Sequence, residues 1–64
     1  MIELLLILEN EYDIQHYLFS SSEDLEKYLN TINQKEYIYK NILFIVDGEV
    51  NHIMTKIYKK KYLR

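Results

Sequence analysis

The chain has 64 residues, a formal net charge of −2 at pH 7 and no cysteine. This length predicts one domain, residues 1–64, near the lower size limit for folding alone. The lack of cysteine excludes disulfides and thiolate metal sites, two of the usual ways in which small domains are stabilised. We therefore expect the chain to gain part of its stability by associating with another molecule.

The charges are unevenly distributed along the chain. Residues 1–55 carry three lysines and ten acidic residues, a net −7, whereas residues 56–64 carry four lysines and one arginine, a net +5. A general nucleic-acid binder presents a basic face, so a mostly acidic body argues against that class.

The composition also points to a source and a location. Nine isoleucines and seven tyrosines, with no alanine, proline or tryptophan, are typical of an AT-rich genome, such as that of a low-GC bacterium or of a virus that infects one. The apolar run Leu4–Leu8 is too short for a signal-peptide core or a membrane span. We expect a cytoplasmic protein without membrane contact, located in the host cytoplasm if the gene is viral.

Residues 2–19 are predicted to form a β-hairpin. The first apolar run is too short for a helix and has no N-cap, and Glu9–Glu11 resembles a hairpin turn. A loop of three residues places the even-numbered residues of 14–18 on the same face as those of 4–8, whereas a loop of two residues places them with the odd-numbered ones. We expect the first register, because it gathers the polar side chains of the hairpin on the other face.

Residues 21–33 are predicted to form the only helix. Ser21 is expected to cap it together with Asp24, and Ser20 with Glu23 is an equally acceptable pair. Apolar side chains follow at i, i+3, i+4 and i+7 and form one stripe, made of Leu25, Tyr28, Leu29 and Ile32. One stripe of this kind covers one face of a small sheet.

Residues 37–58 are predicted to form a second hairpin. The run Tyr37–Val46 is the most strand-like in the chain, and Asp47-Gly48 is a strong signal for a two-residue hairpin turn. Val50–Tyr58 alternates as the returning strand. The basic tail, residues 59–64, either extends that strand or frays.

Together these elements predict an α+β fold with the element order ββαββ. We expect a four-stranded, mainly antiparallel sheet with one helix packed on one face, and strands in the order 2-1-3-4. Strand 1 is expected at the centre because it is the most hydrophobic of the four.

This architecture leaves one face of the sheet uncovered, although the sequence makes both faces apolar. Leaving such a face in water would forgo several kcal/mol, and a patch of a few hundred Å² usually marks an interaction site. The uncovered face is expected to carry Leu5 and Ile7 with one of two sets, either Leu43, Ile45, Val50 and Met54 or Ile42, Phe44, Ile53 and Ile57.

The predicted interface combines aliphatic residues with tyrosines, which are frequent at binding hot spots. It consists of Leu5, Ile7, Ile42, Phe44, Ile53, Ile57, Tyr37, Tyr39, Tyr58 and Tyr62. Three coverings of the face stay open: the chain's own tail, a second copy in a two-fold homodimer, and a different protein. We expect the homodimer, which is compatible with a further protein target.

No motif predicts catalysis, a cofactor or a metal. His16 and His52 are expected mid-strand on apolar faces, without a neighbouring carboxylate to complete a metal site. The acidic residues around both turns are expected to be solvated, and the single glycine excludes a phosphate-binding loop. We therefore expect no catalytic, cofactor-binding or metal-ligating residues and no enzyme activity.

The sequence favours a small non-enzymatic protein-interaction module that regulates or inhibits a larger protein by occluding its surface. A virus-encoded inhibitor of a host enzyme or defence system is one natural case, because a short gene suffices for occlusion. Two alternatives stay open: nucleic-acid binding through the basic tail, and imitation of nucleic-acid charge by the acidic body.

Overall fold

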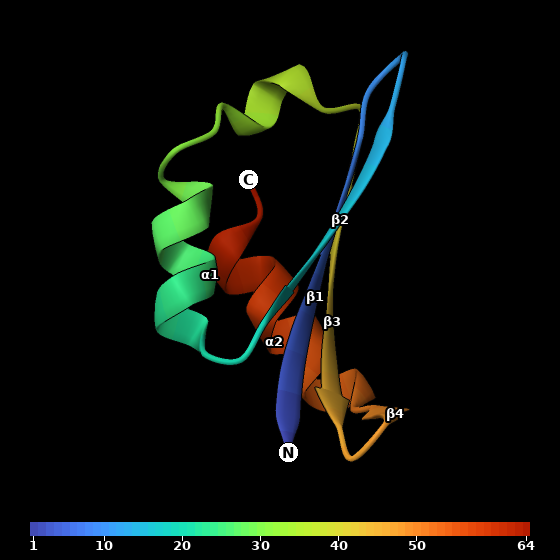
Figure 1. The fold of residues 1–64 in the computed structure, drawn as a ribbon, viewed down its shortest axis with the longest axis vertical. Helices are drawn as coiled ribbons and strands as arrows, with labels where there is room; N and C mark the ends of the chain where they lie inside the picture. The colour runs from blue at the N-terminus through green and yellow to red at the C-terminus, as the bar shows by residue number, and fades with distance from the viewer.

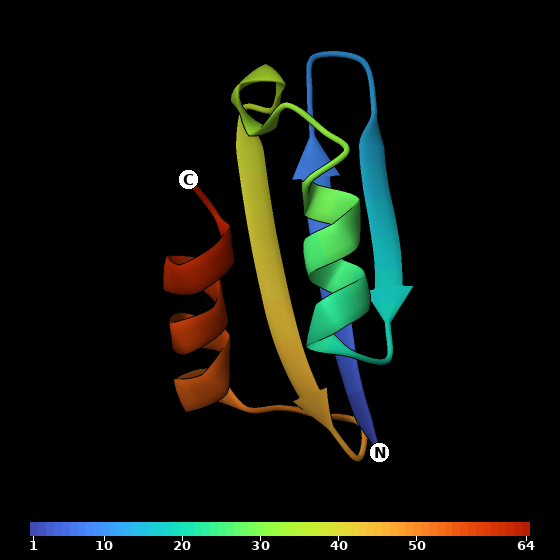
Figure 2. The ribbon, with the colours of Figure 1, turned by 90° about the vertical axis from the view of Figure 1, so that its left-hand side faces the viewer.

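The computed structural model describes all 64 residues, and its strands form one antiparallel sheet (Figures 1 and 2). The elements follow one another as β1 (Ile2–Glu9), β2 (Ile14–Phe19), helix α1 (Ser22–Leu29), the short 3-10 helix η1 (Gln34–Glu36), β3 (Tyr39–Val46), β4 (Glu49–Val50) and helix α2 (His52–Tyr62). The strand order is β2-β1-β3-β4. The α+β class, the antiparallel sheet and the strand order agree with the prediction, whereas the element order ββαββ with a single helix is wrong in its last element.

The segment after β4 is a helix and not the predicted returning strand. Asn51 begins this helix, since its side-chain oxygen accepts a hydrogen bond from the backbone N–H of Met54 at 3.0 Å. Lys59–Lys61 lie in its last turn, where cations complement the negative end of the helix dipole. Only Glu49–Val50 pairs with β3 before the cap redirects the chain, so most of the basic tail is helical as well.

The first hairpin adopts the register that the prediction rejected. Asn10 organises a loop of four residues between β1 and β2, because its side-chain oxygen accepts two backbone N–H groups of that loop at 2.9 and 3.0 Å. This even-numbered loop pairs Leu5 with Leu18 and Ile7 with His16. The polar side chains of β2 are therefore not gathered on one face. Gln15 shares the face of Tyr17 and Phe19, which pack toward α1, whereas His16 lies on the opposite face.

The second turn is the predicted two-residue turn Asp47-Gly48. Both residues have positive φ angles, 49° and 82°, as a type I′ turn requires and as aspartate and glycine tolerate. The turn pairs Val46 with Glu49 and Ile45 with Val50. Ile45 and Val50 therefore share a face, as expected from the sequence.

The two helices pack on different parts of the sheet (Figures 1 and 2). Helix α1 covers one face, over β1 and β2, whereas α2 lies along the outer edge of β3, with its C-terminal end toward the α1 side. Ser21 caps α1 as predicted, accepting the backbone N–H of Asp24 at 3.2 Å. The helix ends at Leu29 and not at residue 33, because the N–H and the hydroxyl of Thr31 both donate to the carbonyl of Tyr28.

The hydrophobic core lies between this sheet face and the two helices. Its buried side chains come from β1, β3 and α1 and are Leu4, Leu6, Leu8, Leu25, Leu29, Ile42 and Phe44. Successive side chains of a strand point to opposite faces, so the even-numbered residues of β1 enter the core and the odd-numbered ones face away from it.

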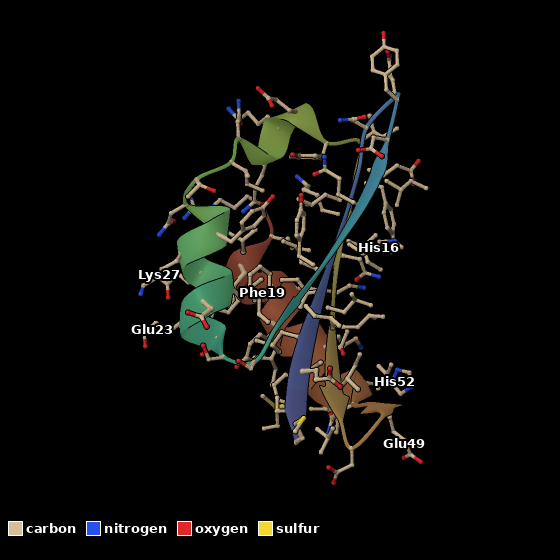
Figure 3. The ribbon with its side chains drawn as sticks, viewed as in Figure 1. His16, Phe19, Glu23, Lys27, Glu49 and His52 are labelled. Carbon is tan, nitrogen blue, oxygen red and sulfur yellow. The ribbon has the colours of Figure 1, made fainter.

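Aromatic rings fill the space between β2 and α1. The ring centroid of Tyr28 lies 4.7 Å from that of Tyr17 and 5.7 Å from that of Phe19. Figure 3 shows Phe19 directed toward α1 and His16 directed away from it. Hydrogen bonding to Tyr17, followed by burial and by the charges of Tyr17 and Tyr37, raises the pKa of Tyr28 to about 12.

The outer edge of β3 is covered by α2, whereas that of β2 has no neighbouring strand. Thr55 is the one buried polar residue, and its hydroxyl accepts the backbone N–H of Phe44 at 2.9 Å. The carbonyl of Phe44 accepts the N–H of Asn51 at 2.8 Å, and the N–H of Ile42 donates to the side chain of Asn41 at 2.9 Å. Helix α2, its cap and a side chain of β3 thus supply the polar partners that a longer β4 would otherwise provide.

Replacing Thr55 with valine is expected to destabilise the fold by about 1–3 kcal/mol, because the buried N–H of Phe44 loses its acceptor while the side-chain volume stays the same. Urea denaturation of both proteins measures the difference. Thr55→Ser keeps the hydroxyl and should retain most of the stability. If Thr55→Val were as stable as the wild type while Thr55→Ser was destabilised, the methyl group of Thr55 would matter and the hydrogen bond would not.

The raised pKa of Tyr28 predicts a loss of stability in alkaline solution. Tyr28 of the unfolded chain ionises near the ordinary tyrosine pKa of 10.0, whereas the folded protein keeps this proton up to about pH 12. Between these values the folded state binds more protons, so the free energy of unfolding falls as the pH rises. Urea denaturation at several pH values should show a shallower decline in Tyr28→Phe, whereas Tyr12→Phe, at an exposed loop position, should behave like the wild type.

Candidate interaction surface

The sheet face that points away from the helices carries side chains from all four strands. The strand register places Leu5 level with Leu18 and Leu43, and Ile7 level with His16. We call this surface the open face, and its members are Glu3, Leu5, Ile7, Glu9, Ile14, His16, Leu18, Tyr39, Asn41, Leu43, Ile45 and Val50.

No helix or loop of the chain lies over the middle of the open face, and the first turn of α2 borders it beside β4 (Figure 1). Leu18 is 61% exposed and Ile14 is 57% exposed, and the central aliphatic side chains are half-buried only by their neighbours in the sheet. Strand spacing and rise make the face about 25 Å long and about 15 Å wide. An apolar patch of this size is in the range that marks interaction sites on monomeric proteins.

The charged groups of the open face are acidic. Glu3 and Glu9 stand near the two ends of β1, and no lysine or arginine belongs to this face. Asn41 is satisfied within the chain, because its amide nitrogen donates to the hydroxyl of Tyr39 at 3.0 Å. The surface therefore has an aliphatic centre and a carboxylate toward either end.

The structure places three of the predicted interface residues on the open face: Leu5, Ile7 and Tyr39. Ile42 and Phe44 belong to the core under the helices, so the second of the two predicted sets is not the outer one. Three members of the first set, Leu43, Ile45 and Val50, lie on the open face, and Met54 lies in α2.

The other predicted interface residues lie away from the open face. Ile53 and Ile57 project from α2 into solvent, while Tyr37 is half-buried against the core. Tyr58 packs on Phe44 with ring centroids 5.0 Å apart, and Tyr62 lies 5.4 Å from Tyr58. These two tyrosines of α2 are engaged in packing and are not presented for stacking on nucleic-acid bases.

Two members of the open face, Ile14 and Leu18, were absent from the predicted interface. Their alternation along β2 was visible in the sequence, but the register decided to which face they belong. The signal for that register is Asn10, a residue whose side chain often closes a loop on the backbone two or three residues further on.

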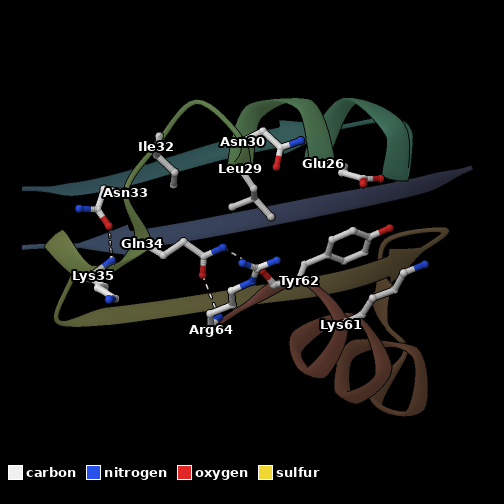
Figure 4. A pocket seen from close by; sticks show the side chains of 10 residues that line it. All are labelled: Glu26, Leu29, Asn30, Ile32, Asn33, Gln34, Lys35, Lys61, Tyr62 and Arg64. Atoms are coloured by element: carbon white, nitrogen blue, oxygen red, sulfur yellow. Dashed lines mark hydrogen bonds between the residues drawn. The ribbon is translucent and has the colours of Figure 1, made fainter.

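A cleft of about 470 Å³ lies between the end of α1, η1 and the end of α2 (Figure 4). Its lining consists of Glu26, Leu29, Asn30, Ile32, Asn33, Gln34, Lys35, Lys61, Tyr62 and Arg64. The amide of Gln34 crosses it, donating to the carbonyl of Tyr62 at 2.9 Å and accepting the N–H of Arg64 at 2.8 Å. The ammonium group of Lys40 adds hydrogen bonds to the carbonyls of Gln34 and Arg64.

These contacts give the cleft a structural role. Its cations Lys61 and Arg64 lie at the C-terminal end of α2, where they complement the helix dipole, and Lys35 lies in η1. Gln34 uses both ends of its amide to hold the end of the chain against η1. The hydrogen bonds across the cleft hold the end of α2 against η1, and we call this contact the seam.

The potential metal ligands do not converge. No three His, Asp or Glu side chains lie close enough together to hold a metal ion. His16 is in the middle of β2 and His52 is the first residue of α2, so the predicted mid-strand position is correct only for His16. Both side chains point away from α1 (Figure 3).

Comparison with protein-family models, with curated proteins and with solved structures finds no match to this chain. Neither α1 nor α2 is long and apolar enough to cross a membrane. Function has to be inferred from the geometry of the chain itself.

Proposed function

We propose that the chain is a non-enzymatic protein-interaction module that associates with itself through the open face, in the simplest case as a homodimer. The observation that carries this proposal is that α1 covers only one face of the sheet and α2 packs at the edge of β3, which leaves an aliphatic layer from four strands exposed. Burial of apolar area contributes about 25 cal/mol per Å², so covering this layer is worth several kcal/mol. That amount is large for a domain of 64 residues.

A contact-making role also fits the kind of side chain that the open face offers. Its aliphatic groups supply contact area and no nucleophile or proton donor, and His16, level with Ile7, has no carboxylate partner in a cluster. The seam near η1 holds polar groups, but its central amide is occupied by the end of the chain. Binding is therefore the activity that the exposed groups can support directly.

The self-association predicts a change of molar mass in a single variant. Leu18→Lys places a charge on the open face at a side chain that is already 61% exposed, so the fold should persist. We expect its dissociation constant to rise at least about ten-fold, equivalent to about 1.4 kcal/mol. Light scattering and sedimentation over a concentration series measure this effect.

Ile38→Lys is the matched control, because Ile38 is 72% exposed between η1 and β3, outside the open face. It should associate like the wild type. A wild-type chain that stays monomeric throughout the concentration series would overturn the proposal, as would equal masses for Leu18→Lys and the wild type.

A regulatory or inhibitory role is the wider part of the proposal. A compact chain with a contact surface suits the occlusion of a larger protein, and a viral gene whose product acts in the host cytoplasm is the source that the isoleucine- and tyrosine-rich composition favours. Tagged protein should retain one stoichiometric partner from a low-GC bacterial lysate at several salt concentrations. Failure to retain any partner would count against the inhibitory role and leave the self-association standing.

A further inference from the structure

The solvent-facing side of α2 carries an unusual stripe. Ile53, Lys56, Ile57 and Lys60 follow one another at i, i+3, i+4 and i+7, so they lie on one face of the helix. The opposite face packs on the sheet through Thr55, Tyr58 and Tyr62. We call the outer stripe the α2 ridge.

The α2 ridge is apolar and basic at once. Ile53 is 75% exposed and Ile57 is 50% exposed, at positions where a surface helix normally carries polar side chains. Isoleucine is also no better than average as a helix former, so local propensity does not explain the pair. Lys56 and Lys60 have no acidic partner, because the ion pairs of the fold are Met1–Asp47 and Lys27–Glu23.

The open face and the α2 ridge are complementary in character. The open face has an aliphatic centre with Glu3 and Glu9 toward its ends, about 20 Å apart at the rise of a strand. The ridge has two isoleucines with two lysines and is about 10 Å long at the rise of a helix. The ridge is therefore short enough to lie between the two carboxylates, and its lysines supply the positive charges that the open face lacks.

Two open faces are less well matched to each other. A sheet-on-sheet pair brings four carboxylates of Glu3 and Glu9 to one interface that contains no lysine or arginine. Charges that lose water without gaining a counter-charge oppose association. Within one molecule the ridge cannot cover the open face, because α2 packs on β3 and the core through its opposite side, so the ridge points away from the sheet.

We propose that a second copy covers the open face with its α2 ridge, and not with its own open face. This inference rests on the self-association proposed above and names the surface of the partner copy. The contact is heterologous, since each molecule offers a face to one neighbour and a ridge to another. Two molecules close into a pair only if both contacts form at once; otherwise the chains add head to tail as concentration rises.

The deciding experiment mixes two variants that each destroy one side of the contact. Leu18→Lys damages the open face and leaves the ridge intact, whereas Ile57→Glu damages the ridge and leaves the open face intact. Each variant alone should associate at least about ten-fold more weakly than the wild type. Their equimolar mixture should recover a 1:1 complex, because it contains one intact face and one intact ridge.

Ile38→Lys and Ile38→Glu are the matched controls, since they add the same charges at an exposed position outside both surfaces. Circular dichroism and thermal melting confirm that all four variants are folded. The wild-type mass should also fall when salt is raised from about 0.01 M to about 1 M, which shortens the Debye length from about 30 Å to about 3 Å.

Three outcomes overturn the inference. If Ile57→Glu associates like the wild type while Leu18→Lys does not, the open faces pair with each other, and the proposed self-association survives. If both variants are weakened and their mixture stays monomeric, the two residues do not belong to opposite sides of one contact. If the wild type itself never associates, the proposed self-association fails together with the inference.

Discussion

The alternation of side chains along β1 is the constraint on which the rest of the fold depends. β1 is hydrogen-bonded to β2 on one side and to β3 on the other, so its side chains can point only to the two faces of the sheet. Leu4, Leu6 and Leu8 are fully or almost fully buried under the helices. Leu5 and Ile7 then have to face the other way, where the chain has no further element to cover them.

Helix α2 packs at the edge of β3 and does not cover the open face. If β4 had continued as the predicted returning strand, it would have extended the sheet, and α1 alone would have covered one side. Instead Asn51 turns the chain into α2, which fills the core beside Phe44 and supplies the hydroxyl of Thr55 to the backbone of β3. The result is a dry core on one side of the sheet and an unprotected aliphatic layer on the other.

Local chemistry made about half of this structure predictable. The cap at Ser21, the turn at Asp47-Gly48 and the central position of β1 follow from residue types whose preferences are strong. The register of the first hairpin and the helix α2 were missed, because each depends on a single asparagine that competes with a plausible alternation. At Asn51 the alternation of Val50, His52 and Met54 suggested a strand, but the tertiary contact between Thr55 and Phe44 favours the helix.

The candidate surface, like the fold, could be predicted only in part from the sequence. That one face of the sheet would stay apolar and uncovered could be deduced by counting strands and helices, and Leu5 and Ile7 were assigned to it correctly. The choice between Leu43 and Ile42 could not be made, because it turns on which side the helices take. Ile53 and Ile57 were expected on a returning strand as part of the interface, and their helical spacing became meaningful only once α2 was known.

The two edges of the sheet differ in whether their peptide groups already have hydrogen-bond partners. This difference determines where a further strand can be added to the sheet. Beyond β3 the peptide groups already have partners in Thr55, Asn51 and Asn41, so an incoming chain finds little to bind there. Beyond β2 nothing lies alongside. Strand addition by an extended peptide, whether in an aggregate or in a designed ligand, is therefore directed to that one border of the molecule.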